Sequence, residues 1–313
     1  MATMHHFGLD VGIYGALADP PTILRLAGLA ESAGFESIWV ADHVVFPVKF
    51  KSEYPYSAKG DFPSTLDDPL MEPLAVMGVL VGATKRVRIG TAVLIIPYRN
   101  PVVTARQLIT LDQFSGGRII LGAGVGWLEE EFEALDTFDF KRRGKATDEY
   151  IDIFKRLAAG GEVGFQGETY SFDPVFSSPG SVQRPHPPVL IGGIADPALK
   201  RVARLGNGWL AVAAPPDVLA ASLAKLKTFT TAEGRRFDDI SLTYKIFLNI
   251  GEAKRGRFDA REPGTGSLDE IVEDLKRITA LGFSRIIVRC RGRTATLLEQ
   301  QMARFVDEIA PRV

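Results

Sequence analysis

The sequence predicts an α/β fold, the eight-stranded (β/α)8 TIM barrel, because eight apolar, strand-like segments are each followed by a helix-like segment. The length of 313 residues is ordinary for this fold, and no shift in composition marks a second domain. A doubly wound sheet would use fewer strands or would need a separate domain for the insertions. We therefore expect residues 1–313 to form a single barrel domain.

The predicted strands are short apolar runs. The third begins at Val87, is rich in β-branched residues and stops before Pro97, as is typical of a strand buried on both faces. The eight strands are expected at residues 7–13, 35–41, 87–95, 118–121, 188–191, 208–212, 240–250 and 283–289.

Capping residues mark the helices between these strands. Asn100 offers a side-chain oxygen as N-cap, and Pro101 follows at the first helical position, where its missing N–H costs nothing. Ser267 precedes an acidic first turn in the same manner. The helices are expected at residues 19–33, 69–83, 101–115, 145–159, 197–205, 217–232, from 267 onward and at 294–309.

Three connections are longer than a compact barrel needs, and they predict insertions after strands 2, 4 and 7. Residues 44–69, 160–187 and 251–266 lack a sustained period, and such long loops are often functional. The acidic run Glu129 to Glu131, just after the fourth strand, is interpreted as a solvated helix start.

Composition excludes several classes of partner. A formal charge of −1 gives no reason to expect nucleic acid or an anionic membrane, and no apolar run approaches the roughly 20 residues of a membrane helix. The first residues do not resemble a secretion signal. Cys290 is the only cysteine, so we expect no internal disulfide, a buried thiol and a location in the reducing cytoplasm.

Asp42 and His43 follow the second strand directly, where barrel enzymes carry catalytic groups. A histidine there can act as an acid or base near neutral pH, and the adjacent carboxylate could tune it. A capped or core histidine at a strand end is the alternative. The other histidines have no partner at metal-ligand spacing, so we expect no metal site.

Glycine-rich turns follow other strands. The run Gly122-x-Gly124-x-Gly126 lacks the spacing of a dinucleotide-binding fingerprint but allows a flat ligand close to the backbone. Gly192-Gly193, ahead of a helix, could present backbone N–H groups to a phosphate. Phosphate binding or plain solvation are both open for the basic loops after strands 7 and 8, which carry Arg255, Arg257, Arg261, Arg289, Arg291 and Arg293.

A series of motifs in order along the chain resembles the bacterial luciferase-like superfamily and, within it, the branch of coenzyme F420-dependent oxidoreductases. The segments that carry the resemblance are Ser37-Ile-Trp-Val-Ala-Asp-His43, Ile89-Gly-Thr-Ala-Val93, Tyr98-Arg-Asn-Pro101 with Gln107-Leu108, Ser115-Gly-Gly-Arg118, Leu121-Gly-Ala-Gly-Val-Gly-Trp-Leu-Glu-Glu-Glu-Phe132, Asp148-Glu-Tyr-Ile151, Gln183-Arg-Pro-His-Pro-Pro-Val-Leu-Ile-Gly-Gly193, Arg204-Leu-Gly-Asn-Gly-Trp209 and Gly264-Thr265.

The resemblance implies a set of site residues. The family's non-proline cis peptide, which supports the middle ring of the flavin, would fall at Ala92-Val93. Asp42 and His43 match the pair near the reactive ring atom. The remaining matches are Ile95, Val125 and Gly126, which would line the flavin or its ribityl chain, and Gly192 and Gly193, which would form the phosphate turn.

The resemblance also implies the reaction. We expect F420-dependent hydride transfer to or from a small organic substrate, with His43 as acid/base. The alternatives are an FMN-dependent monooxygenase served by a flavin reductase, and a flavin-binding relative without turnover. Trp127 replaces the glutamate proton donor of sugar-phosphate dehydrogenases, which argues against that reaction. A homodimer is expected from the family. An apolar substrate is suggested by the aromatics Trp39, Tyr54, Tyr56, Phe62 and Trp127.

Overall fold

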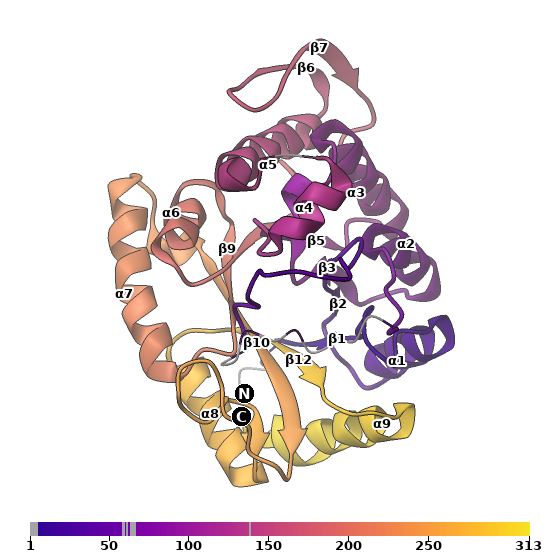
Figure 1. Ribbon diagram of the computed structural model, residues 1–313, viewed down its shortest axis with the longest axis vertical. Helices are drawn as coiled ribbons and strands as arrows, with labels where there is room; N and C mark the ends of the chain where they lie inside the picture. Colours follow the sequence, from indigo (N-terminus) through magenta and orange to yellow (C-terminus); the bar gives the residue numbers. More distant parts are fainter. Residues whose placement is uncertain (1–5, 58–59, 61, 63–66, 138) are drawn as a thin grey trace.

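Eight parallel strands close into a barrel in the computed structural model, which describes residues 6–57, 60, 62, 67–137 and 139–313 (Figure 1). Each strand pairs with the next one in the barrel, and β9 pairs with β10 to close the ring. The predicted TIM barrel is therefore confirmed. In order around the barrel, the strands are β1 (His6–Asp10), β2 (Ser37–Val40), β3 (Arg88–Thr91), β5 (Ile119–Gly124), β8 (Val189–Gly192), β9 (Gly208–Val212), β10 (Ser241–Ile250) and β12 (Arg285–Cys290).

Helices surround the barrel, and their ends follow the capping residues of the sequence. The side chain of Asn100 accepts from the N–H groups of Val102 and Val103, and Ser267 forms a capping box with Glu270. Both predicted N-caps are confirmed. The outer helices are α1 (Pro20–Ser32), α2 (Pro73–Ala83), α3 (Pro101–Ser115), α5 (Arg143–Ala159), α6 (Asp196–Leu205), α7 (Pro216–Ala232), α8 (Leu268–Ala280) and α9 (Ala295–Arg304).

The long connections contain further short elements. Between β3 and α3 lie β4 (Leu94–Ile95), which pairs with β5, and the 3-10 turn η1 (Ile96–Tyr98). The connection after β5 contains α4 (Glu129–Leu135) and η2 (Phe140–Arg142) before α5, and an antiparallel hairpin of β6 (Gly161–Gln166) and β7 (Ser171–Ser177) after it. The hairpin projects beyond α5 at the top of Figure 1. The remaining short elements are β11 (Thr265–Gly266), which pairs with β10, and η3 (Phe237–Asp239), η4 (Phe305–Ile309) and η5 (Ala310–Arg312).

Trp39 is the largest side chain in the interior of the barrel. It is fully buried, it packs with residues such as Ile120 and Ile287, and its Nε1 donates to Ser37 Oγ at 2.8 Å. Its neighbours on β1 and β3 are glycines: a Cβ at Gly90 would lie 2.5 Å from the indole. Trp39 therefore gives no information about the substrate, because its ring fills the barrel and does not line the cavity at the carboxyl ends of the strands.

The chain offers no helix for crossing a bilayer: within the described ranges, none is both long and apolar enough.

Candidate active site

One cavity of about 400 Å³ opens at the carboxyl ends of the barrel strands. This is the position at which TIM-barrel enzymes bind their ligands. The cavity is lined by every residue that the sequence singled out as a site residue, namely Asp42, His43, Ala92, Val93, Ile95, Val125, Gly126, Gly192 and Gly193. The structure thus brings all nine residues together, from the ends of β2, β3, β4, β5 and β8.

The Ala92–Val93 peptide bond, between β3 and β4, forms one wall of the cavity. The bond is cis, as predicted. The side chain of Val93 occupies space that two glycines on neighbouring strands leave free. A Cβ at Gly124 would lie 2.4 Å from Val93 Cγ2, and one at Gly192 would lie 2.7 Å from Val93 Cγ1. The small residues after β5 and β8 are therefore needed to seat this wall.

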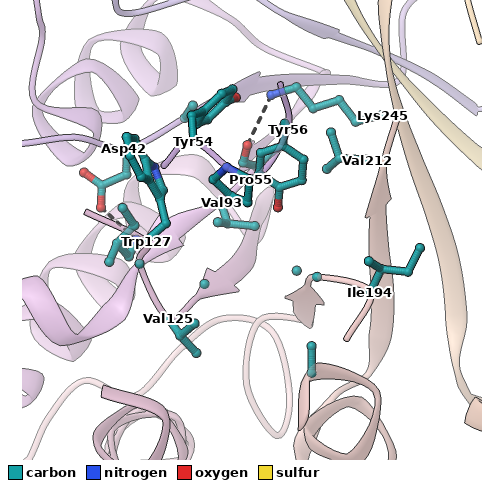
Figure 2. Close-up of a pocket in the computed structure, with 18 of the residues that line it drawn as sticks. Asp42, Tyr54, Pro55, Tyr56, Val93, Val125, Trp127, Ile194, Val212 and Lys245 are labelled. Atoms are coloured by element: carbon teal, nitrogen blue, oxygen red, sulfur yellow. Dashed lines mark hydrogen bonds between the residues drawn. The ribbon is translucent and has the colours of Figure 1, made fainter. Parts of the chain in front are cut away.

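Lys245, on β10, supports the wall from inside the barrel. Its Nζ donates to the carbonyl oxygen of Ala92 at 3.2 Å, the dashed line that starts at Lys245 in Figure 2, and it also ion-pairs with Asp10. Arg289 Nη1 donates to the other Asp10 oxygen at 2.9 Å. Burial alone would raise the pKa of Asp10, but these two cations outweigh it and hold that pKa below its ordinary value. Arg289 is thus a partner of Asp10 rather than a free phosphate ligand.

His43 is buried and is hydrogen-bonded to Glu131 on α4. Its Nδ1 lies 2.7 Å from Glu131 Oε2, and the Glu131 side chain is completely buried. Three further donors reach the same carboxylate: the N–H groups of Val44 and Val45 at 2.6 and 3.2 Å, and the Tyr98 hydroxyl at 2.7 Å. Burial, reinforced by the Glu131 charge, raises the pKa of Tyr98, so its hydroxyl stays protonated. The interpretation of this acidic run as a solvated helix start is therefore wrong for Glu131.

These four contacts assign the tautomer of His43. Three other donors already point at this carboxylate, so we assign it as the acceptor towards His43 as well, with the hydrogen on Nδ1. Nε2 lies on the opposite edge of the ring and has no hydrogen-bond partner among the residues that the structure describes. In neutral His43 this atom holds the lone pair that a general base requires, and His43 lines the cavity.

Asp42, next to His43 in the chain, is held by different partners. Arg99 forms two hydrogen bonds with its carboxylate, at 2.7 and 2.9 Å, and the N–H of Ile95 donates to it at 2.8 Å. Burial raises the pKa of Asp42, while the Arg99 guanidinium opposes that effect. Arg99 also contacts Glu72 at 2.8 Å. Asp42 therefore links the end of β2 to β4. It is not the hydrogen-bond partner of His43, which is Glu131.

Aromatic rings surround the imidazole of His43. Their centroids lie 4.6 to 6.1 Å from it, which is ordinary contact distance for aromatic pairs. The rings are those of Tyr14, Phe46, Phe62 and Trp127. Trp127 also stacks with Phe62 and meets Tyr54 edge to face at 5.3 Å (Figure 2). This cluster limits the access of water to the histidine.

Another part of the cavity is lined by the start of α6 and by Arg143. Gly193 has φ +117°, a conformation that other residues rarely adopt, and it leads into Ala195 and Pro197 at the helix start. The guanidinium of Arg143 donates to the carbonyls of Gly126 and Phe140, at 3.2 and 2.8 Å. Among the described residues no carboxylate pairs with Arg143, so this side of the cavity is cationic.

The luciferase-like monooxygenase family model matches residues 1–255. The chain belongs to this family. An uncharacterized protein of Mycobacterium tuberculosis is 31% identical over 314 residues, covering 98% of each chain. The FMNH(2)-dependent dimethylsulfone monooxygenase of Pseudomonas putida is 26% identical over 261 residues, covering 83% of this chain and 64% of that protein.

Among solved structures, an F420-dependent secondary alcohol dehydrogenase in complex with an F420–acetone adduct shares the fold of this luciferase-like chain. The TM-score is 0.77 at 18% identity, with 99% of this chain and 98% of the other covered. Family membership supports an enzyme with a flavin-type cofactor, since relatives and structural neighbours use FMN or F420.

Several residues of this luciferase-like site were not assigned a role from the sequence. Glu131, Tyr98, Arg99 and Lys245 act through contacts with side chains far along the chain. Tyr98, Arg99 and Glu131 do lie inside motifs that carried the family resemblance, which was the available signal for them, whereas Lys245 lies in none. For the described chain, no group of three or more His, Cys, Asp or Glu side chains could hold a metal ion.

Proposed function

We propose that this protein is an F420-dependent oxidoreductase that transfers hydride between the deazaflavin and a small organic substrate, with His43 as the acid/base. The observation that carries the proposal is the placement of His43: its Nδ1 is held by Glu131, and the residue lines the same cavity as the cis Ala92–Val93 wall. A protonable atom held at fixed orientation beside a flat apolar wall suits proton exchange with a substrate lying against a flavin-like ring.

The lining residues fit such a cofactor. The wall of Val93, Ile95 and Val125 is apolar and suits a flat ring system, and the glycines beside it permit close approach to the backbone. The start of α6 and the Arg143 guanidinium would hold an anionic tail, since a helix N-terminus and a cation both favour negative charge.

Bound F420 would supply two-electron hydride chemistry. The chain's own residues would orient the substrate and handle its proton. His43 Nε2 would take the proton from an alcohol oxygen, or return it to a carbonyl oxygen in the reverse direction, and Glu131 would stabilise the charged imidazole. Asp42 would act as a positioning residue, because its carboxylate is committed to Arg99 and to the Ile95 backbone. The rings of Phe62 and Trp127 would keep water away.

The second candidate is an FMN-dependent monooxygenase with a separate flavin reductase as its partner. The relative from Pseudomonas putida favours it, since that protein is FMNH(2)-dependent. Either enzyme would use the same wall and the same histidine, so the cofactor itself decides between them. The third candidate is a flavin-binding protein without catalytic turnover.

Cofactor binding tests the proposal directly. F420 and FMN are titrated separately into the purified protein by calorimetry, and mass spectrometry identifies the cofactor retained after expression in an F420-producing host. We expect F420 to bind and to be retained. Tight binding of FMN with no measurable F420 binding would overturn the assignment.

The role of His43 is tested with F420-loaded protein and a panel of alcohols, aldehydes and enones. His43→Gln should keep F420 affinity and lose about 10²- to 10⁴-fold in kcat, the usual contribution of a general acid/base. His186→Gln is the matched control, because His186 contacts the carbonyl of its neighbour Pro187 and does not line the cavity. A His43→Gln enzyme as fast as wild type would remove His43 from the mechanism.

We also propose a homodimer, formed through α2 and α3. Three apolar side chains on these helices are open to solvent in the single chain: Val79 and Val103 are each 56% exposed, and Phe114 is 82% exposed. α2 and α3 pack against each other, and exposed apolar side chains that gather on adjoining elements are a feature of protein–protein contact surfaces. A cytoplasmic location stays a prediction from the single cysteine.

A further inference from the structure

The cations that line the cavity differ in whether they are neutralised. Lys245 ion-pairs with Asp10, and Arg201 ion-pairs with Asp148. Arg257, in the loop after β10, lines the same cavity and has no carboxylate partner among the residues that the structure describes. The positive charge of Arg257 is therefore available to a ligand, as is that of Arg143, which we assign to the cofactor, whereas the charges of Lys245 and Arg201 are already balanced.

The hydrogen-bonding capacity of Arg257 is also largely unused. Its Nη1 donates to the carbonyl oxygen of Pro55 at 2.6 Å, which fixes the direction of the guanidinium. Its Nε is buried and has no partner, and no described residue accepts from Nη2. A guanidinium has five N–H donors in a planar fork that matches a carboxylate or a phosphate. A fixed fork with unused donors is suited to bind an anionic acceptor.

The surroundings of Arg257 are aromatic. Its Cζ lies 5.4 Å from the centroid of the Tyr56 ring and 4.5 Å from that of Phe258. Tyr56 in turn meets Tyr54, which contacts Phe62 and Trp127. A continuous aromatic surface therefore runs from Arg257 to the rings that enclose His43 (Figure 2 shows Tyr54, Tyr56 and Trp127).

We propose that Arg257 binds an anionic group of the substrate, while the apolar body of the substrate lies on the aromatic surface next to His43. The substrate class is thus a small molecule with an apolar, planar or alicyclic body, an alcohol or carbonyl at one end and a single carboxylate or phosphate at the other. The assignment of the alcohol or carbonyl end rests on the proposed function. The recognition of the anion rests only on Arg257 and the rings beside it.

Three probes of similar shape test this recognition: phenylacetate, its neutral amide phenylacetamide, and phenyl phosphate. Their dissociation constants are measured by ligand-observed NMR on the full-length protein, with and without bound cofactor. Wild-type protein should bind the better of the two anions at least about tenfold more tightly than the amide, which is the ratio expected for one charge-assisted contact. The stronger of phenylacetate and phenyl phosphate identifies the anionic group.

Two variants test whether Arg257 causes the preference for the anion over the amide. Arg257→Gln should reduce the anion-to-amide ratio to about one. Arg255→Gln should leave it unchanged, because Arg255 lies two residues away in the same loop and is paired with Asp259. Equal affinity of wild-type protein for anions and amide, or a preference that survives in Arg257→Gln, would overturn the proposal.

A failure of anion recognition by Arg257 can be distinguished from a failure of the proposed oxidoreductase function. Protein that binds neither F420 nor FMN would refute the oxidoreductase assignment, yet the anion preference would still be measurable without cofactor. Conversely, normal F420 binding together with equal affinity for the anions and the amide would refute only the role of Arg257.

Discussion

Replacing Glu131 by glutamine keeps the size of the side chain and changes which of its atoms can accept a hydrogen bond. The N–H groups of Val44 and Val45 need an acceptor, so the oxygen of the glutamine amide must point towards them. The NH₂ group then faces Tyr98 and His43. Since this group only donates, Nδ1 of His43 must accept, and the ring hydrogen moves to Nε2. The variant should therefore hold the wrong tautomer at the cavity.

The expected effects on activity and stability differ. A neutral His43 with hydrogen on Nε2 cannot take a proton there, so kcat should fall by about 10²- to 10⁴-fold. In Glu131→Gln only the hydroxyl hydrogen of Tyr98 loses its acceptor, so the melting temperature should fall less than in Glu131→Leu. Glu131→Leu is the comparison: it leaves several buried donors unpaired at about 1–3 kcal/mol each. Three or four such donors amount to about 3–12 kcal/mol, and at about 2 °C per kcal/mol for a chain of this size the melting temperature should fall by roughly 6–24 °C.

The tautomer can be measured without a substrate. Two-bond ¹H–¹⁵N spectra of histidine rings distinguish hydrogen on Nδ1 from hydrogen on Nε2, and the chain has only 4 histidines. The signal of His43 is the one that disappears in His43→Gln. Wild-type protein should show the Nδ1–H form and Glu131→Gln the Nε2–H form. An Nε2–H form in wild-type protein, or unchanged spectra in the variant, would refute the reasoning.

Two further predictions concern stability and assembly. The pKa of Asp10 is held low by Lys245 and Arg289 against the effect of burial, so its stabilising contribution is complete above the unfolded pKa of about 3.9 and is lost as the pH falls through the folded value. Melting temperature against pH from 6 to 2.5 should thus fall less steeply for Asp10→Asn than for wild type; equal slopes would contradict this. Phe114→Glu should convert a wild-type dimer to monomer in analytical ultracentrifugation with no change in melting temperature, and a monomeric wild type would contradict the homodimer.

The barrel could be predicted because its signals are local. Capping side chains such as Asn100 and Ser267 bond to backbone groups within three residues, so the sequence alone carries the pattern. The cis bond at Ala92–Val93 was predicted differently, through the family resemblance, since neither an alanine nor a valine favours that geometry by itself. Val93 fits because Gly124 and Gly192 have no side chains, and these two glycines lie on strands that come later in the chain.

The site around His43 shows why the remainder could not be predicted. Asp42 and His43 are adjacent, and in extended backbone successive side chains point to opposite sides. One therefore reaches Arg99 and the other Glu131, and the neighbouring carboxylate that the sequence offered as a partner of the histidine faces elsewhere. Glu131 lies 88 residues from His43, and its neighbours Glu129 and Glu130 suit a helix start equally well. Only the packing of α4 against the end of β2 distinguishes Glu131 from the other two glutamates. Glu131 alone is completely buried, and its carboxylate therefore needs buried hydrogen-bond donors.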